Sequence, residues 1–312
     1  MKYKILLYFF LPILLFSCNN NLETKSPNVI IVITDDQGYG DIGYNGNPHL
    51  ITPNLDKFAG ESIRFNNFNV SPVCAPTRSS LLTGRYSLRT GVTDTYNGGA
   101  IMSSNEITLA EIFNEKNYKT GIFGKWHLGD NYPSRPSDQG FQESLIHLSG
   151  GIGQVGDFTN YYKGSTSYYD PILWLNNKQE KYNGYCSDIF TDEAIKFIED
   201  NKDNQFFCYL SFNAPHTPLQ VPDKYYQMYK DIDPTNINGE SLEMTEKNIL
   251  DAKKIYGMVT NIDENFGKLI NKLDELNLKE NTIVIFMTSI LLVIIILSPN
   301  LFVFKLIGCL YV

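Results

Sequence analysis

The 312-residue sequence is poor in cysteine, histidine and tryptophan, with five, four and two residues respectively, and it contains no run of basic residues. No Cys-x-x-Cys pair or mixed Cys/His spacing occurs, which argues against a structural zinc site. A nucleic-acid binder needs clustered lysine and arginine for its phosphate contacts, whereas here 34 acidic residues outnumber 26 basic ones. The composition also excludes a collagen, a disordered chain and a small disulfide-stapled protein. We therefore expect a globular protein that binds no nucleic acid.

Residues 28–289 contain no internal repeat and no low-complexity linker, which favours one continuous domain. Four apolar runs rich in β-branched residues predict strands buried on both faces, at residues 28–34, 119–124, 205–212 and 281–288. Helical patterns lie between them, at residues 187–200 and 251–278 and after a Thr108–Glu111 capping box. This alternation predicts an α/β fold whose mostly parallel sheet binds ligands beyond the carboxyl ends of its strands.

The N-terminal segment has the pattern of an export signal. Lys2 and Lys4 precede an apolar run that ends in Leu-Phe-Ser-Cys18, and a small residue before the cut is typical of a secretory signal. The ending resembles a bacterial lipobox, in which the cysteine is lipidated and becomes the mature N-terminus. We expect a lipoprotein signal at residues 1–18, a tether at 19–27, and a protein anchored by lipid to a bacterial membrane, in the periplasm or at the cell surface. An ordinary cleaved signal with an incidental cysteine is the alternative.

Two adjacent carboxylates, Asp35 and Asp36, directly follow the first predicted strand and precede a glycine-rich loop. They would repel one another unless a cation lay between them. Hard oxygen ligands favour Ca²⁺ or Mg²⁺ over zinc. A solvated turn leading into the loop is the other interpretation.

Residues 71–85 read SPVCAPTRSSLLTGR and predict a helix that begins near Cys74 and is closed by Gly84. Backbone N–H groups and the helix dipole favour an anion at such an N-terminus, and Arg78 lies within reach of residue 74. By itself this position fits either a reactive thiolate or a packed small residue.

Taken together, Cys74-x-Pro-x-Arg78 followed by Ser-x-Leu-x-Thr-Gly-Arg resembles the signature of the type I sulfatases. Four further segments resemble the family in the same order, at residues 34–41 (TDDQGYGD), 52–56 (TPNLD), 124–129 (GKWHLG) and 213–218 (NAPHTP). The resemblance implies an alkaline-phosphatase-like α/β/α sandwich that hydrolyses sulfate esters of aryl compounds or carbohydrates.

The resemblance also implies a modified nucleophile. Cys74 would be oxidised to Cα-formylglycine by a formylglycine-generating or anaerobic sulfatase-maturating enzyme. The aldehyde hydrate attacks sulfur and displaces the alcohol, and its second hydroxyl then expels sulfate. Asp35, Asp36 and residue 74 match the calcium ligands of the family, with Mg²⁺ as the lesser alternative.

Four more residues match the family's catalytic positions. Arg78 and Lys125 match the groups that neutralise the hydrate and the sulfate. His127 matches the group that helps to deprotonate the hydrate. His216 matches the general acid beside the departing oxygen.

The pattern breaks after Ser289. Family members continue with Asp-Asn-Gly, which completes the calcium shell, whereas this chain continues with Ile290 and Leu291 and has no acidic residue after Glu280. The family's later sulfate-binding lysine also has no counterpart. We therefore expect an incomplete catalytic domain at 28–289, lacking the C-terminal part of the fold, and an aberrant hydrophobic tail at 290–312. A frameshift or premature stop is the main explanation, and a tail-anchored variant is the other.

Loss of two ligands predicts weak calcium binding and impaired activity. The alternatives are a phosphonate or phosphodiester hydrolase of the same superfamily, or a vestigial, non-catalytic membrane-associated protein. Outside the motifs, Cys186 and Cys208 could form a disulfide or remain buried thiols, and His49 and His147 are expected at the surface or in the core. A tyrosine group could line a sugar cleft or an ordinary loop, namely Tyr161, Tyr162, Tyr168 and Tyr169.

Overall fold

The computed structural model describes residues 26–65, 67–152, 167–237, 239–289 and 293–296. These residues form a nine-stranded sheet with the order β2-β11-β10-β1-β7-β3-β4-β5-β6. Its five central strands are parallel: β10 (Thr282–Thr288), β1 (Asn28–Asp35), β7 (Phe206–Pro215), β3 (Lys119–Lys125) and β4 (Glu143–His147). The flanking strands pair in antiparallel fashion: β11 (Val293–Ile296), β2 (Ile63–Arg64), β5 (Ile172–Leu175) and β6 (Lys178–Lys181).

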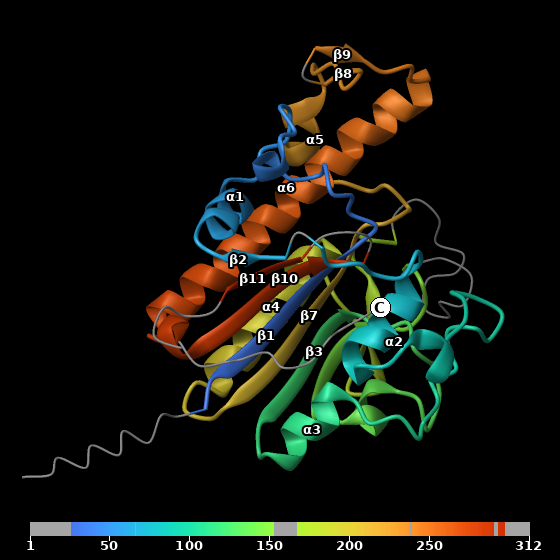
Figure 1. Cartoon of the computed structure of the whole chain (residues 1–312), viewed down its shortest axis with the longest axis vertical. Coiled ribbons are helices and arrows are strands. Elements are labelled where there is room, and N and C mark those ends of the chain that lie inside the picture. Colours follow the sequence, from blue (N-terminus) through green and yellow to red (C-terminus); the bar gives the residue numbers. More distant parts are fainter. Residues whose placement is uncertain (1–25, 66, 153–166, 238, 290–292, 297–312) are drawn as a thin grey trace, which may run out of the picture.

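Helices cover both faces of this sheet, as Figure 1 shows. One face carries α1 (Pro53–Gly60), α4 (Cys186–Asp200) and α6 (Glu246–Glu275), and the other carries α2 (Cys74–Thr83) and α3 (Leu109–Glu115). A further helix, α5 (Asp223–Tyr229), lies against α6, near a small hairpin of β8 (Asn236–Ile237) and β9 (Glu240–Ser241). Short 3₁₀ turns occur at Gly43–Asn45, Ser87–Arg89, Pro136–Gln139 and Lys279–Asn281.

Strand β1 explains why the chain folds in three layers. Successive side chains of a strand point to opposite faces. Ile30 and Val32 accordingly pack under α1, α4 and α6, whereas Ile31 and Ile33 pack under α2 and α3. A strand buried on both sides needs an uninterrupted apolar run, which is the sequence feature that predicted it. The predicted α/β/α sandwich with a mostly parallel sheet is confirmed.

The structure contains the predicted strands and helices, and their ends differ from the predicted ends by a few residues. The helix expected at 251–278 begins earlier, at Glu246, because the Thr245 hydroxyl caps it by accepting from the Asn248 N–H. The capping box of α3 is confirmed: the Thr108 hydroxyl accepts from the Glu111 N–H, and the Glu111 carboxylate accepts from the Thr108 N–H at 2.8 Å. Cys186 and Cys208 are both buried free thiols, so the disulfide alternative is wrong.

The predicted signal at 1–18, most of the tether at 19–27 and most of the tail at 290–312 lie outside the described residues. Only Val293–Ile296 of the tail is described, as strand β11 between β10 and β2. Within the part of the chain that the structure describes, no helix combines the length and apolar character needed to cross a membrane.

A buried carboxylate on α6 holds the start of α1. The Asp263 oxygens accept hydrogen bonds from the Leu55 N–H at 2.7 Å, the Asn54 N–H at 3.2 Å and the Asn54 side-chain amide at 2.8 Å. The first N–H groups of a helix have no partner within the helix, so another element must satisfy them. Asp263 does this across the helix–helix contact and fixes α1 against α6.

We therefore expect Asp263→Ala to destabilise the fold by about 2 kcal/mol, because it leaves buried donors without an acceptor. The midpoint of urea unfolding measures this change. Asp274→Ala is the matched control, because Asp274 is an exposed carboxylate near the end of the same helix and its loss should stay within about 0.5 kcal/mol. Equal effects of the two substitutions would contradict the role given to Asp263.

Candidate active site

The carboxyl ends of four parallel strands bring the motif residues together. Asp35 ends β1, Lys125 ends β3, His216 follows β7, and Ser289 follows β10. Cys74 is the first residue of α2 and faces the same edge. Because parallel strands end on a common edge, segments distant in sequence converge at the place where α/β proteins bind ligands.

The Asp35 carboxylate is the centre of this cluster and has no exposed surface. It accepts from the Lys125 ammonium at 2.5 Å, from Nη2 of Arg78 at 3.1 Å and from the Ser289 hydroxyl at 3.1 Å. Burial alone would raise the pKa of Asp35, but the charges of Lys125 and Arg78 hold it well below its usual range. Asp35 is therefore ionised at neutral pH, and both cations are fixed by it.

Two basic groups converge on the Cys74 sulfur, which is itself buried. The Lys125 Nζ lies 3.4 Å from Sγ, and Nδ1 of His127 lies 3.4 Å from it. The N-terminus of α2 adds the positive end of its dipole at the same point. An anionic group formed on the side chain of residue 74 would thus be met by a cation and by a ring nitrogen.

The hydrogen bonds of His127 determine which proton it can move. Its Nε2 lies 2.9 Å from the Thr95 carbonyl oxygen, which can only accept, so Nε2 carries the hydrogen. Burial, reinforced by the charge of Lys125, lowers the pKa of His127 to about 3. The ring is therefore neutral at pH 7 and turns the free lone pair of Nδ1 toward Cys74. That is the arrangement of a general base for a proton on residue 74.

Hydrogen bonds to the backbone of β3 and to a serine on β7 fix the Arg78 guanidinium in place. Its Nη1 donates to the Lys125 carbonyl at 3.2 Å and to the Ser211 hydroxyl, which in turn donates to the same carbonyl. Gly124 lets the backbones of β3 and β7 approach closely at this point: its φ is +117°, and a Cβ there would lie 1.8 Å from the Ser211 backbone carbonyl oxygen. The glycine of the GKWH motif thus has a steric role.

Asp36 and His216 face each other at the solvent side of the site. His216 Nε2 lies 3.5 Å from an Asp36 oxygen, and the Asp36 side chain is 39% exposed. Burial and the neighbouring charge of Asp35 raise the pKa of Asp36. The Tyr168 hydroxyl donates to the His216 carbonyl at 2.9 Å and fixes the loop that carries this histidine.

Asp36 and His127 both have left-handed backbone conformations, with φ values of 61° and 59°. Non-glycine residues adopt this region at a cost of about 1 to 3 kcal/mol, and such strain gathers at functional sites. Here the surrounding contacts compensate: the Asp36 N–H donates to the Ser289 hydroxyl, and the His127 N–H donates to the Leu148 carbonyl.

The donors present fit a divalent cation in part. Asp35 and Asp36 supply hard carboxylate oxygens, and unfavourable ionisation of adjacent carboxylates is what a cation relieves. However, Asp35 already accepts from three donors, and no group of three His, Cys, Asp or Glu side chains able to hold a metal occurs among the described residues. Among the described residues, the Asp35 and Asp36 carboxylates supply at most four oxygens, fewer than the six to eight that Ca²⁺ takes.

The structure also places histidines and tyrosines outside the motifs, and neither ring nitrogen of the buried His147 has a hydrogen-bond partner among the described residues. His147 is buried at the end of β4, consistent with the core placement, and His49 binds the Asn236 carbonyl through Nε2. Tyr168 is fully buried and supports the His216 loop, so it does not line a cleft. Tyr161 and Tyr162 lie outside the described residues.

The supporting contacts of three residues escaped sequence reasoning, namely Tyr168, Ser211 and Ser289. A serine in a strand has no distinctive pattern, and Tyr168 lies 48 residues before the loop that it supports. For Ser289 a signal was available, since it directly follows the last strand at the same edge as Asp35.

The chain is similar in sequence and fold to known sulfatases. The chain is 31% identical to the ulvan-active sulfatase of Formosa agariphila over 292 residues, covering 87% of this chain and 53% of that protein. It is 41% identical to mouse arylsulfatase G over 239 residues, covering 68% and 46%. The crystal structure of Ps i-CgsB in complex with k-i-k-neocarrahexaose matches with a TM-score of 0.70 and 32% identity, covering 85% of this chain and 58% of that one.

The chain spans about half the length of the curated relatives it matches. The family model described as Sulfatase matches residues 27–289, which include every motif residue gathered at the sheet edge. By both its sequence and the arrangement of its fold, the chain belongs to the sulfatase family.

Proposed function

We propose that the protein hydrolyses sulfate esters, with a nucleophile derived from Cys74. The observation that carries the proposal is the convergence of Lys125 and His127 on the Cys74 side chain, with Asp35 and Arg78 locked beside it. One relative is an ulvan-active sulfatase and another was solved in complex with a neocarrahexaose, which supports a sulfated glycan as the substrate.

In this proposal, Cys74 is oxidised to Cα-formylglycine by a maturating enzyme of the host. As its hydrate, this group supplies one hydroxyl that attacks sulfur and a second whose loss of a proton releases sulfate. The neutral His127 takes a proton at Nδ1, and Lys125 stabilises the negative charge at residue 74. His216, at the solvent side of the site, donates a proton to the departing alcohol.

We further propose that Ca²⁺ binds at Asp35, Asp36 and residue 74, but weakly. Such an ion would polarise a sulfate oxygen and favour an ionised nucleophile. Ile290 and Leu291 stand where the family has Asp and Asn, so two ligands are lost and the activity of this chain is impaired.

Conversion of Cys74 is directly testable. Mass spectrometry of the peptide containing residue 74, from protein made with a maturating enzyme, should detect the aldehyde. Cys74→Ala should then lower hydrolysis of 4-nitrophenyl sulfate by at least about 10³-fold, because the nucleophile is lost. Cys208→Ala is the matched control, because it removes a buried free thiol from the interior of β7 and should leave turnover unchanged.

An unmodified thiol in an active preparation would refute this nucleophile. Assay of 4-nitrophenyl phenylphosphonate in parallel separates the alternative activity: a higher kcat/KM on the phosphonate than on the sulfate would refute sulfate-ester hydrolysis as the main reaction.

The missing ligands can be restored. We expect Ile290→Asp combined with Leu291→Asn to tighten Ca²⁺ binding at least about tenfold, because it adds oxygen donors where the family has them. Calorimetric titration measures the affinity, and the rise in Tm with Ca²⁺ gives an independent readout. Ile290→Thr with Leu291→Ser, which adds polarity without a carboxylate, should leave the affinity unchanged. A parent chain that binds Ca²⁺ as tightly as the restored variant would contradict the proposed weakness.

We also propose that the protein is exported and anchored to a bacterial membrane by lipid on Cys18. Expressed in a bacterium with labelled palmitate, the chain should incorporate label and sediment with membranes. Cys18→Ser should abolish the labelling, since the lipid bonds to the cysteine sulfur. Cys309→Ser controls for adventitious acylation, and labelling that survives Cys18→Ser would count against the anchor.

A further inference from the structure

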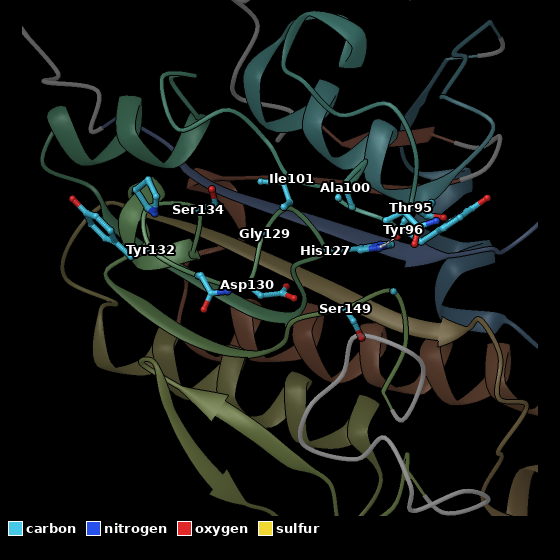
Figure 2. Close-up of a pocket in the computed structure, with 15 residues that line it drawn as sticks. Thr95, Tyr96, Ala100, Ile101, His127, Gly129, Asp130, Tyr132, Ser134 and Ser149 are labelled. Atoms are coloured by element: carbon cyan, nitrogen blue, oxygen red, sulfur yellow. Dashed lines mark hydrogen bonds between the residues drawn. The ribbon is translucent and has the colours of Figure 1, made fainter.

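The two histidines of the site contact backbone carbonyls through different ring nitrogens. His127 Nε2 lies 2.9 Å from the Thr95 carbonyl oxygen, at the wall of a cavity that Figure 2 shows. His216 instead places Nδ1 2.6 Å from the Thr217 carbonyl oxygen. Because a carbonyl can only accept, Nδ1 of His216 carries a hydrogen, and Nε2 faces Asp36. The proton that His216 can give to a departing alcohol is therefore the one on Nε2.

The orientation of the His216 ring thus depends on where the Thr217 carbonyl lies. The Tyr168 hydroxyl donates to this carbonyl at 3.1 Å and to the His216 carbonyl at 2.9 Å. Tyr168 has no exposed surface, so water does not compete for its hydroxyl. Since both acceptors are carbonyls, the single hydroxyl hydrogen points toward the loop, and the hydroxyl oxygen is left to accept from another group.

Asn213 and Cys186 extend these contacts into the core. The Cys186 thiol donates to Oδ1 of Asn213 at 3.3 Å, and both side chains are fully buried. Burial raises the pKa of the Tyr168 hydroxyl well above its ordinary value, and the adjacent Asn213 side chain opposes this rise. Asn213 Nδ2 has no fully formed hydrogen bond with a described residue, so the Tyr168 oxygen is the acceptor available to it.

The direction of each hydrogen in this network follows from the loop carbonyls. Tyr168 gives its hydrogen to them, so the Asn213 amide must turn Nδ2 toward Tyr168 and Oδ1 toward Cys186. Cys186 must then be the donor, which requires a protonated thiol. Burial raises the pKa of Cys186 to about 12, so the thiol is protonated at neutral pH.

The same segments also hold the other end of the loop that carries His216. The Tyr168 N–H donates to Oε1 of Gln220 at 2.9 Å, and the Tyr185 hydroxyl donates to the Gln220 carbonyl at 2.8 Å. The Cys186 N–H in turn donates to the Tyr168 carbonyl at 2.9 Å. The start of α4 and Tyr168 are therefore joined, and together they fix the loop at both of its ends.

We propose that Cys186 and Asn213 are positioning residues for His216. Acting through Tyr168, they hold the Thr217 carbonyl in place and with it the Nδ1–H form of the ring, whose Nε2 is directed toward the reacting groups. The role of His216 in this inference rests on the proposed sulfatase function, whereas the arrangement around the ring does not. A buried thiol outside every motif thereby has a role that serine can fill and alanine cannot.

The tautomer of His216 tests the arrangement without turnover. In the full chain with ¹⁵N-labelled histidine rings, at about pH 9, where histidine is ordinarily neutral, NMR distinguishes Nδ1–H from Nε2–H. His216→Gln identifies the His216 signals among the four histidines. We expect the Nδ1–H form in the parent chain. Tyr168→Phe or Cys186→Ala should lower the ratio of Nδ1–H to Nε2–H at least about threefold, the effect of one lost hydrogen bond.

Two further variants make this test specific. Cys186→Ser should keep the ratio within about twofold of the parent value, because a hydroxyl also donates. Cys208→Ala is the matched control, because it removes a buried free thiol from the interior of β7 and should leave the ratio unchanged. An Nε2–H ring in the parent chain, or equal ratios in Cys186→Ala and Cys208→Ala, would overturn the inference.

The choice of leaving group separates a positioning role from a purely structural one. Phenol is a poorer leaving group than 4-nitrophenol, so phenyl sulfate relies more on a proton from His216. In the maturated chain with Ile290→Asp and Leu291→Asn, Tyr168→Phe or Cys186→Ala should lower kcat/KM for phenyl sulfate at least about fivefold more than for 4-nitrophenyl sulfate. Equal losses on the two substrates would refute the positioning role. Absence of turnover before either substitution, together with the expected tautomers, would refute the sulfatase function and support the arrangement around His216.

Discussion

The buried Asp35 carboxylate is the constraint on which the rest of the structure depends. It accepts from Lys125 on β3, Arg78 on α2 and Ser289 after β10, and so connects four elements by one ionised group. Removing one partner of a buried ion pair leaves an uncompensated charge and costs about 3 to 5 kcal/mol. The same contacts aim Lys125 at Cys74. The ion pairs of Asp35 therefore both stabilise the fold and orient Lys125 toward Cys74.

The central layer of the fold could be predicted because burial leaves a signal in the sequence. Strands β1, β7 and β10 are apolar along their length, since helices cover both of their faces. The edge of the sheet could not be predicted in this way. All four residues of β6 (Lys178–Lys181) are exposed, so hydrophobic periodicity gives no indication of a strand there. The first turn of α6 is likewise polar and exposed, and its start depends on a local cap.

The same distinction applies to the site. Asp35, Asp36 and Cys74 could be singled out because they follow a recognisable strand or begin a recognisable helix, and strand ends meet at one edge. Lys125, His127 and His216 were identified only through the resemblance to the type I sulfatases. Ser211 and Tyr168 could not be identified, because their contacts join segments between 48 and 133 residues apart and neither residue type is distinctive at its position. The cavity beside His127 could not be predicted for a related reason. Two of its lining residues, Tyr96 and Tyr132, lie on separate loops, and only the folded chain brings these loops to the same cavity (Figure 2).

The charges of the site explain why a sulfatase of this fold would need a divalent ion. Arg78 and Lys125 bring two positive charges, but Asp35 and Asp36 bring two negative ones, so the charges of these side chains near Cys74 cancel when all four are ionised. With a net charge of −8, the chain as a whole supplies no attraction for an anion. The dipole of α2 adds only a partial charge. A sulfate ester would thus meet a nearly neutral cluster, and a divalent ion bound at Asp36 would make it positive. In the proposed mechanism, having Ile290 and Leu291 in place of two ligands would therefore weaken substrate binding as well as the activation of residue 74.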